Sequence, residues 1–221
     1  MKPISTVIIG AGHSGLAMSS ELARRGVDHV VLERGQVANS WRTERWDSLR
    51  LLSPNWMNGL PGAPYRGTDP DGYMDVPELV AAFDAFARSG GAPIRSETEV
   101  MSVTREAGRY RVQTDQGALW ADSVVVATGA CAIPKPPACA AGMPARIAGF
   151  TPLNYKRPSQ LPPGDVLVVG ASASGLQIAR ELVLDGRGVT LAVGNHLRMP
   201  RIYRGADILR WMEVTGLMDV S

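Results

Sequence analysis

The chain has 221 residues, a formal net charge of +2, and 45% apolar and 20% charged residues. This is the composition of an ordinary globular protein with a sizeable core, in one or two domains. The small basic excess without basic tails argues against nucleic-acid binding, and no apolar run is long enough to cross a membrane. The sequence enters a predicted strand at Ile4, so we expect no signal peptide and a cytoplasmic location.

The cysteines and histidines do not form a metal or redox motif in the sequence. Cys131 and Cys139 are eight residues apart. This spacing fits neither a CxxC redox pair nor a zinc site, so we expect two reduced structural thiols. His13, His29 and His196 are scattered along the chain. No metal site is therefore predicted.

A glycine-rich segment follows the first predicted strand, an apolar and buried one at 4–9. Gly10 allows a tight turn, and Gly12 removes a side chain where a pyrophosphate would approach the backbone. Gly15 lets the next element, a helix at about 14–25, pack closely against the strand. This spacing predicts a dinucleotide-binding loop.

A second predicted strand (29–33) ends in Glu33, 18 residues after the last glycine of the loop. A carboxylate there can accept hydrogen bonds from a ribose diol, and it repels a 2′-phosphate. The first site therefore suits FAD or NAD and disfavours NADP. Because strand, glycines, helix and acidic residue all occur in register, we prefer this interpretation to a glycine-rich turn without a ligand.

The middle of the chain departs from a simple alternation of strands and helices. A helix is predicted at 77–88, with Pro77 in its first turn. A β-meander is predicted over 99–120, with strands at 99–105, 110–114 and 118–120. A separate buried strand is predicted from Ser123, running into the small-residue turn Ala127-Thr128-Gly129.

The first unit is repeated 160 residues later. Eight of the 16 prolines lie between Pro134 and Pro163, and they mark a stiff connector with a domain boundary near 158–164. We therefore expect domains at 1–160 and 161–221. The second unit is predicted to contain a strand at 166–169, a glycine-rich loop at 170–175, a helix at 174–185, a strand at 189–193 and a helix at about 206–214.

The second loop differs from the first in ways that favour another nucleotide. Ser172 stands where glycine is common, and its hydroxyl could donate to a phosphate. The strand at 189–193 does not end in an acidic residue, so nothing there repels a 2′-phosphate. Arginines suit phosphate through bidentate hydrogen bonds, and three of them follow: Arg198, Arg201 and Arg204. NADPH is favoured over NADH; the alternative is a solvated basic loop.

The order of these elements resembles the two-dinucleotide-binding flavoproteins over essentially the whole chain. Its flavin-containing monooxygenase-like branch is the most similar, through Trp41-Arg42, Asp47-Ser48-Leu49, Trp56, Gly59-Leu60-Pro61-Gly62, Tyr155, Pro158, Leu161 and Pro162. A histidine common in that branch is replaced here, with Thr151 nearest to its place. The resemblance implies an α/β fold. It comprises a Rossmann-like FAD-binding domain with an inserted β-meander and a partial second Rossmann-like NAD(P)-binding unit, since relatives continue past the position of Ser221.

The resemblance also implies an FAD-dependent, NADPH-consuming monooxygenase. Hydride would pass from NADPH to flavin N5, and reduced flavin would react with O2 to give a C4a-peroxyflavin that oxidises a small organic substrate. An NAD(P)H-dependent flavin oxidoreductase without oxygen insertion and a truncated nucleotide-binding flavoprotein without turnover stay open. The cysteine spacing disfavours a disulfide reductase. The expected partners are the substrate and O2, with neither nucleic acid nor membrane, and a homodimer is allowed.

Two residues are candidates near the flavin ring, Arg42 and Ser53, and Arg42 could equally be a salt-bridge partner. The resemblance also implies that Trp41 contacts the flavin side of the site. The cofactor-binding residues predicted for FAD are Gly10, Gly12, His13, Ser14, Gly15, Glu33, Arg34, Trp41, Arg42, Val100, Ala127, Thr128 and Gly129. Those predicted for NADPH are Gly170, Ser172, Ser174, Gly175, His196, Arg198 and Arg201.

Overall fold

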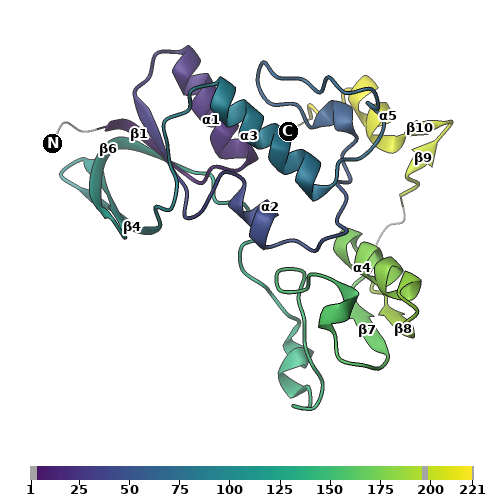
Figure 1. The fold of residues 1–221 in the computed structure, drawn as a ribbon. Coiled ribbons are helices and arrows are strands. Elements are labelled where there is room, and N and C mark those ends of the chain that lie inside the picture. Colours follow the sequence, from purple (N-terminus) through teal and green to yellow (C-terminus); the bar gives the residue numbers. More distant parts are fainter. Residues whose placement is uncertain (1–3, 196–198, 221) are drawn as a thin grey trace.

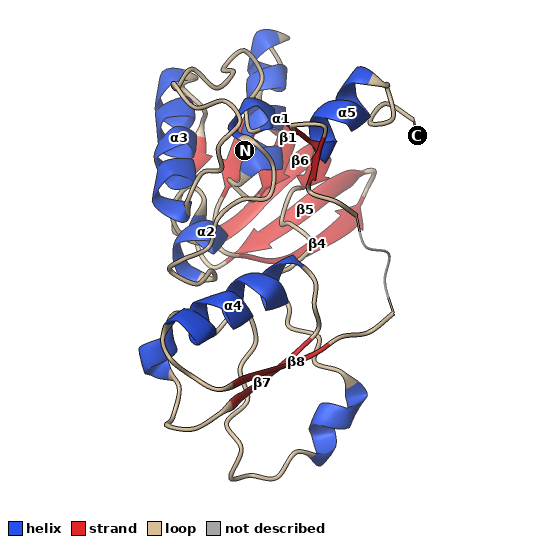
Figure 2. Cartoon of the chain, turned by 90° about the vertical axis from the view of Figure 1, so that its right-hand side faces the viewer, coloured by secondary structure: helices blue, strands red, loops and turns tan. Residues whose placement is uncertain are grey.

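The computed structural model describes residues 4–195 and 199–220, which form two connected units (Figure 1). The first unit is a mixed sheet with helices packed on it. The second is a smaller sheet covered on one side by a helix, and it lies below the first in the view of Figure 2. No helix among the described residues has the length and apolar character needed to cross a membrane.

The sheet of the first unit has the strand order β3-β2-β1-β6-β5-β4. Its strands are β1 (Ile4–Ile9), β2 (His29–Leu32), β3 (Ile94–Arg95), β4 (Val100–Glu106), β5 (Arg109–Thr114) and β6 (Gly117–Val126). β3, β2, β1 and β6 run parallel, whereas β6, β5 and β4 form the antiparallel meander. β2 is buried along its whole length, as expected for a strand covered on both faces.

The prediction of two separate strands at 118–120 and from Ser123 is wrong, because β6 is continuous over both. Its first half pairs with β5 and its second half with β1, and Ala121 pairs with both Tyr110 and Ile4. Ala121 is fully buried at this crossing. No glycine or proline interrupts residues 118–126, so the backbone continues from the meander into the parallel sheet without a turn.

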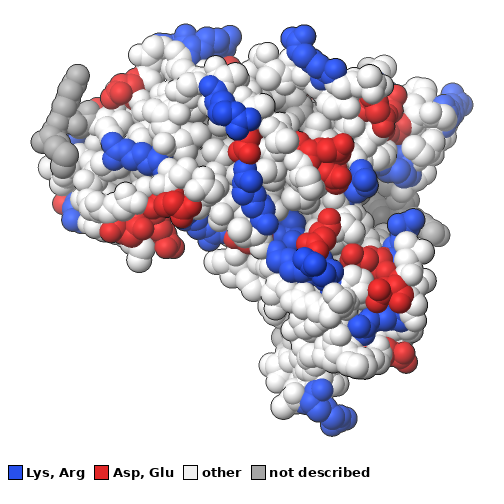
Figure 3. Space-filling model, in the orientation of Figure 1, with Lys and Arg blue, Asp and Glu red and all other residues white. Residues whose placement is uncertain are grey.

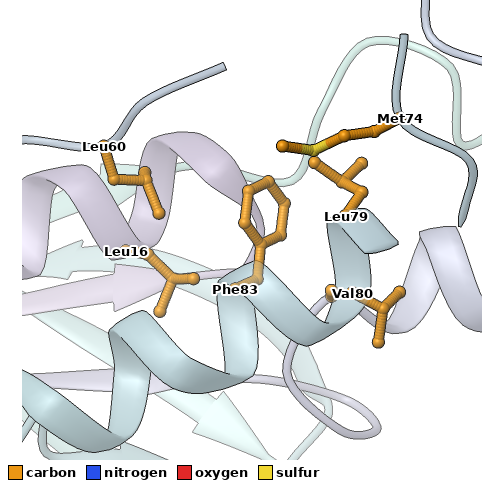
Figure 4. Close-up of a cluster of buried hydrophobic side chains, with 7 residues drawn as sticks. Leu16, Leu60, Met74, Leu79, Val80 and Phe83 are labelled. Atoms are coloured by element: carbon orange, nitrogen blue, oxygen red, sulfur yellow. The ribbon is translucent and has the colours of Figure 1, made fainter. Parts of the chain in front are cut away.

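Three helices accompany this sheet: α1 (His13–Arg24), α2 (Asn39–Thr43) and α3 (Val76–Ser89). α3 begins with a capping box, in which Asp75 accepts from the Glu78 amide at 2.9 Å and Glu78 accepts from the Asp75 amide at 2.9 Å. The buried ring of Phe83 packs α3 against Leu16 of α1 (Figure 4). Ala38, Leu60, Met74, Leu79 and Val80 complete this cluster.

The second unit contains the parallel strands β7 (Val166–Val169) and β8 (Val189–Ala192) and the helix α4 (Ala173–Leu184). Their bounds confirm the predicted strand, loop, helix and strand to within a residue. One sheet face packs on α4, where Leu182 is 1% exposed. The other face is open, with Leu167 62% and Val169 63% exposed.

The segment after β8 returns to the first unit. It holds the short antiparallel pair β9 (Ile202–Tyr203) and β10 (Ala206–Asp207), followed by α5 (Ile208–Val214), which starts two residues later than predicted. The Arg210 guanidinium lies 4.6 Å from the centre of the Trp56 ring. The division at 161–221 stays a prediction, but contacts tie this last segment to the loop around Trp56. Single 3-10 turns occur at Asn55–Met57, Ala138–Gly142 and Pro158–Gln160.

Candidate nucleotide-binding sites

The first glycine-rich loop lies at the carboxyl end of β1, between β2 and β6. The Gly10 amide donates to the Leu32 carbonyl at 2.7 Å, and Gly10 has φ +106°. A Cβ on Gly10 would lie 2.6 Å from the Ala127 carbonyl oxygen, and one on Gly15 would lie 1.8 Å from the Gly10 carbonyl oxygen. Both glycines are therefore required by close packing of the backbone itself.

Gly12 is different, because a Cβ there would meet no heavy atom within 4 Å. Gly12 is the N-cap of α1 and no side chain caps the helix. The first-turn amides of His13, Ser14 and Gly15 have no acceptor among the described residues. Unpaired amides at a helix N-terminus attract anions, so the loop leaves both the space and the donors that a pyrophosphate needs.

Glu33 lies beside this loop, directly after β2, and is 8% exposed. One carboxylate oxygen accepts from the Ala11 amide at 2.7 Å, and the other accepts from the Gly35 amide at 3.3 Å. These bonds fix the carboxylate against the loop. The structure thus brings Glu33 and the three loop glycines together, although they come from two segments of the sequence.

The two candidate catalytic residues are engaged in structural contacts. The Arg42 guanidinium donates to the Val37 carbonyl at 2.8 Å and to the Asp84 carboxylate of α3 at 2.6 Å. The Ser53 hydroxyl donates to the Asn58 side chain within its own loop. Of the two interpretations of Arg42, the structure displays the salt bridge. A catalytic role for either residue stays a prediction.

The other residues predicted for FAD lie at varying places around the loop. Ala127 follows β6 directly, and its amide donates to the Ile9 carbonyl at 2.8 Å. Thr128 and Gly129 come next and are exposed. Val100 begins β4. Arg34 is paired with Glu44. The half-buried Trp41 packs against two hydrophobic clusters, with the Arg45 guanidinium 5.2 Å from its ring centre.

The second loop repeats the internal geometry of the first. The Gly170 amide donates to the Ala192 carbonyl at 3.0 Å, and Gly170 has φ +103°. A Cβ on Gly175 would lie 1.9 Å from the Gly170 carbonyl oxygen. Ser172 is the exposed N-cap of α4 and makes no side-chain cap bond, and Ser174 follows in the first turn. The serine therefore replaces the middle glycine without changing the turn.

The basic residues predicted for NADPH are not gathered at this loop. His196 and Arg198 lie outside the described residues. Arg201 is paired with Asp207 at 2.7 Å, donates to the Tyr73 hydroxyl at 3.3 Å and stacks 4.7 Å from the Tyr73 ring centre. It therefore joins the C-terminal segment to the first unit, and a phosphate-binding role for it stays a prediction. Sequence reasoning missed Tyr73 and Asp207, which are 134 positions apart and carry no local motif.

Basic and acidic side chains are interspersed over the face seen in Figure 3. Cys131 and Cys139 are both free and exposed. Within the described residues, no group of three or more His, Cys, Asp or Glu side chains could hold a metal ion. The groups that the structure places at the two loops are backbone amides, the Glu33 carboxylate and the Ser172 hydroxyl.

Comparison with known proteins places this architecture. Residues 7–204 match the pyridine nucleotide-disulphide oxidoreductase family. An uncharacterized CzcO-like oxidoreductase of Geobacillus kaustophilus is 36% identical over 219 residues, covering 98% of this chain and 62% of the relative. The indole-3-pyruvate monooxygenase YUCCA1 of Oryza sativa is 34% identical, covering 94% of this chain and 54% of that protein. The chain thus spans less than two thirds of these relatives.

A solved structure confirms the fold class. The flavin-containing monooxygenase from Stenotrophomonas maltophilia superimposes with a TM-score of 0.77 at 24% identity, over 96% of this chain and 64% of that one. The predicted Rossmann-like α/β architecture, with a meander inserted in the first unit, is therefore confirmed.

Proposed function

Because the chain belongs to the pyridine nucleotide-disulphide oxidoreductase family, we propose that it is the nucleotide-binding part of a flavin-dependent monooxygenase. The first loop binds FAD, the second binds NADPH, and a small organic substrate is oxidised with O2. The observation that carries this proposal is the first loop, where the open position at Gly12 and the unpaired amides of α1 meet the buried Glu33.

The first loop suits FAD because of charge. The amides at the start of α1 would hold the pyrophosphate, and the helix dipole favours its negative charge. Glu33 keeps acceptor capacity beyond its bonds to the Ala11 and Gly35 amides, so it can also accept from ribose hydroxyls. The same carboxylate repels a 2′-phosphate, which assigns NADPH to the other loop.

The second loop suits NADPH because β8 is followed by Val193, Gly194 and Asn195 and not by an acidic residue. The exposed Ser172 hydroxyl and the first-turn amides of α4 would hold the phosphates. His196 and Arg198 are proposed to contact the 2′-phosphate. Arg201, which is paired with Asp207, is a further candidate for the 2′-phosphate.

Bound flavin supplies hydride acceptance and the reaction with O2, and the chain supplies binding and orientation. Arg42 and Ser53 keep their proposed place near the flavin ring. Neighbours hold both polar groups in one position. The Arg42 guanidinium has further N–H groups to donate, whereas the single O–H of Ser53 already donates to Asn58, so the Ser53 oxygen would act as an acceptor. Trp41 would form a rigid apolar wall on the same side.

Two observations favour a monooxygenase over a disulfide reductase. The relative from Oryza sativa is named as a monooxygenase and matches along 94% of this chain. The two thiols, exposed and eight residues apart, do not form the closely spaced pair that disulfide reduction at a flavin requires.

Thr151 lies nearest to the place of the histidine that is common in the flavin-containing monooxygenase-like branch. Its amide donates to the Asn154 side chain at 2.6 Å, in a local turn.

The proposal is tested on purified protein supplied with FAD. We expect absorption bands near about 370 and 450 nm, typical of bound flavin. NADPH should bleach the band at about 450 nm under argon. When ¹⁸O2 is then the only source of O2, one labelled oxygen atom should enter the oxidised substrate. Bleaching without label in any product of a substrate panel would indicate an oxidoreductase without oxygen insertion. Flavin binding without bleaching would indicate a nucleotide-binding flavoprotein without turnover.

A further inference from the structure

One side chain of α4 forms two hydrogen bonds to the backbone of the first unit. The Gln177 side-chain oxygen accepts from the Arg50 amide at 3.1 Å, and its NH2 group donates to the Arg50 carbonyl at 3.0 Å. The amide group thus pairs with Arg50 as a neighbouring strand would, although the two residues are 127 positions apart. Two hydrogen bonds to one residue fix orientation as well as distance.

A second set of contacts lies one turn further along α4. Tyr155, 2% exposed, donates from its hydroxyl to Glu181 at 2.7 Å. Its ring belongs to a buried cluster with Trp46 and Leu49 of the first unit and Leu182 of α4. α4 is therefore attached to the segment around 46–50 by hydrogen bonds and apolar contacts on the same side.

The segment around 46–50 is itself bonded to the helices of the first unit. Arg50 pairs with Asp75, the N-cap of α3, and its neighbour, Leu51, donates to the Met74 carbonyl at 2.9 Å. α3 in turn packs on α1 through the buried Phe83 (Figure 4). A continuous series of contacts therefore runs from α4 to α1, and each of these two helices begins at a phosphate loop.

Gln177 lies five residues after Ser172, so its bonds to Arg50 are about 7.5 Å along the helix axis from the second loop. A helix is stiff over such a length, and a rotation of α4 about these bonds would move the loop as well. Transfer of hydride between two bound nucleotides depends on their relative placement, and a misplacement of about 1 Å can lower the rate about 100-fold.

We infer that Gln177 is a positioning residue that sets the second phosphate loop relative to the first, through its paired bonds to Arg50. The inference rests on the proposed function, since it assigns the two loops to NADPH and FAD. Gln177 touches neither nucleotide in this assignment. Its effect is therefore expected on the rate of flavin reduction at saturating NADPH and not on the affinity for NADPH.

The test compares Gln177→Ala with Arg180→Ala, a control at an exposed position of the same helix. Flavin bleaching is followed in anaerobic stopped flow over a range of NADPH concentrations. For Gln177→Ala we expect the limiting rate to fall about 10- to 100-fold, with the NADPH dissociation constant and FAD content within twofold of wild type. Gln177→Glu keeps the acceptor for the Arg50 amide, so its limiting rate should lie between those of wild type and Gln177→Ala. It replaces Gln177→Ala in the test if the alanine variant does not fold.

A second readout uses the protein without cofactor. Hydrogen exchange of residues 46–51 should accelerate in Gln177→Ala and stay unchanged in Arg180→Ala. An unchanged limiting rate, unchanged exchange, or a rate loss matched by loss of NADPH or FAD binding would overturn the inference. If the wild-type flavin is not bleached by NADPH, the proposed function fails and the inference fails with it. If NADPH bleaches the wild-type flavin and Gln177→Ala has the same limiting rate, the inference is contradicted and the proposed function is not.

Discussion

The open position at Gly12 allows cofactor binding to be separated from folding. Gly12→Ala adds a methyl group that meets no protein atom within 4 Å, on a backbone with φ −86° and ψ −167° that alanine adopts without strain. Alanine is a poorer N-cap than glycine, so the free energy of unfolding should fall by at most about 1 kcal/mol. For a chain of this size, that is at most about 4 °C in Tm.

The same methyl group should weaken FAD binding strongly. It occupies the space through which a pyrophosphate reaches the first amides of α1. Loss of one hydrogen bond to a charged group costs about 1.5–3 kcal/mol, which corresponds to a dissociation constant about 10- to 150-fold higher. Gly15→Ala is the matched contrast. Its Cβ would lie 1.8 Å from the Gly10 carbonyl oxygen, so we expect about 1–3 kcal/mol of lost stability.

The assay is titration of the apoprotein with FAD, followed by quenching of flavin fluorescence, alongside thermal unfolding by circular dichroism. Gly12→Ala should unfold close to wild type and bind FAD weakly. A Gly12→Ala protein that binds FAD within twofold of wild type would show that no phosphate approaches this loop. A fall in its Tm as large as that of Gly15→Ala would show that the position is closed in solution.

Three further predictions concern other contacts. Arg42→Ala removes one backbone hydrogen bond and one partly exposed ion pair, and should lower the free energy of unfolding in urea by about 1 kcal/mol; an unchanged value would favour a purely catalytic arginine. Burial raises the pKa of Asp207, but the Tyr73 hydroxyl and Arg201 hold that pKa below its ordinary value. Stabilisation by this carboxylate is complete above its unfolded pKa and is lost as pH falls through the folded one, so tryptophan fluorescence should report loosening of 199–220 below about pH 4 in wild type, and no such transition in D207N. Leu167→Lys, on the open face of β7, should reduce binding of the dye ANS and leave the free energy of unfolding within about 0.5 kcal/mol, whereas a loss above about 2 kcal/mol would mean that the face is covered in solution.

The parts of the fold that sequence predicted well are those set by local constraints. Each phosphate loop needs a positive φ at its first glycine and no side chain at its last, and only glycine meets both demands cheaply. The strands before the loops are short apolar runs, and the start of α3 carries the proline that marked its first turn. Such features are visible within about ten residues, so a single sequence suffices to place them.

The parts that were missed depend on partners far along the chain. The ion pair of Arg42 depends on Asp84, 42 positions away. The contact of Arg201 with Tyr73 joins positions 128 apart, and no motif announces it. The short elements α2 and β3 are too brief for a periodic pattern, and their place comes from the elements around them.

The two phosphate loops show where local and distant constraints divide. Gly10 and Gly170 share nearly the same φ and the same hydrogen bond to the second strand of their unit. A Cβ on Gly10 would strike the Ala127 carbonyl after β6, whereas one on Gly170 would meet nothing within 4 Å. The difference arises because β6 flanks the first loop and no third strand flanks the second among the described residues. The second loop is held within its own unit by the bond of Gly170 to Ala192, so its placement relative to the first unit depends on the contacts of α4, which include the bonds of Gln177 to Arg50.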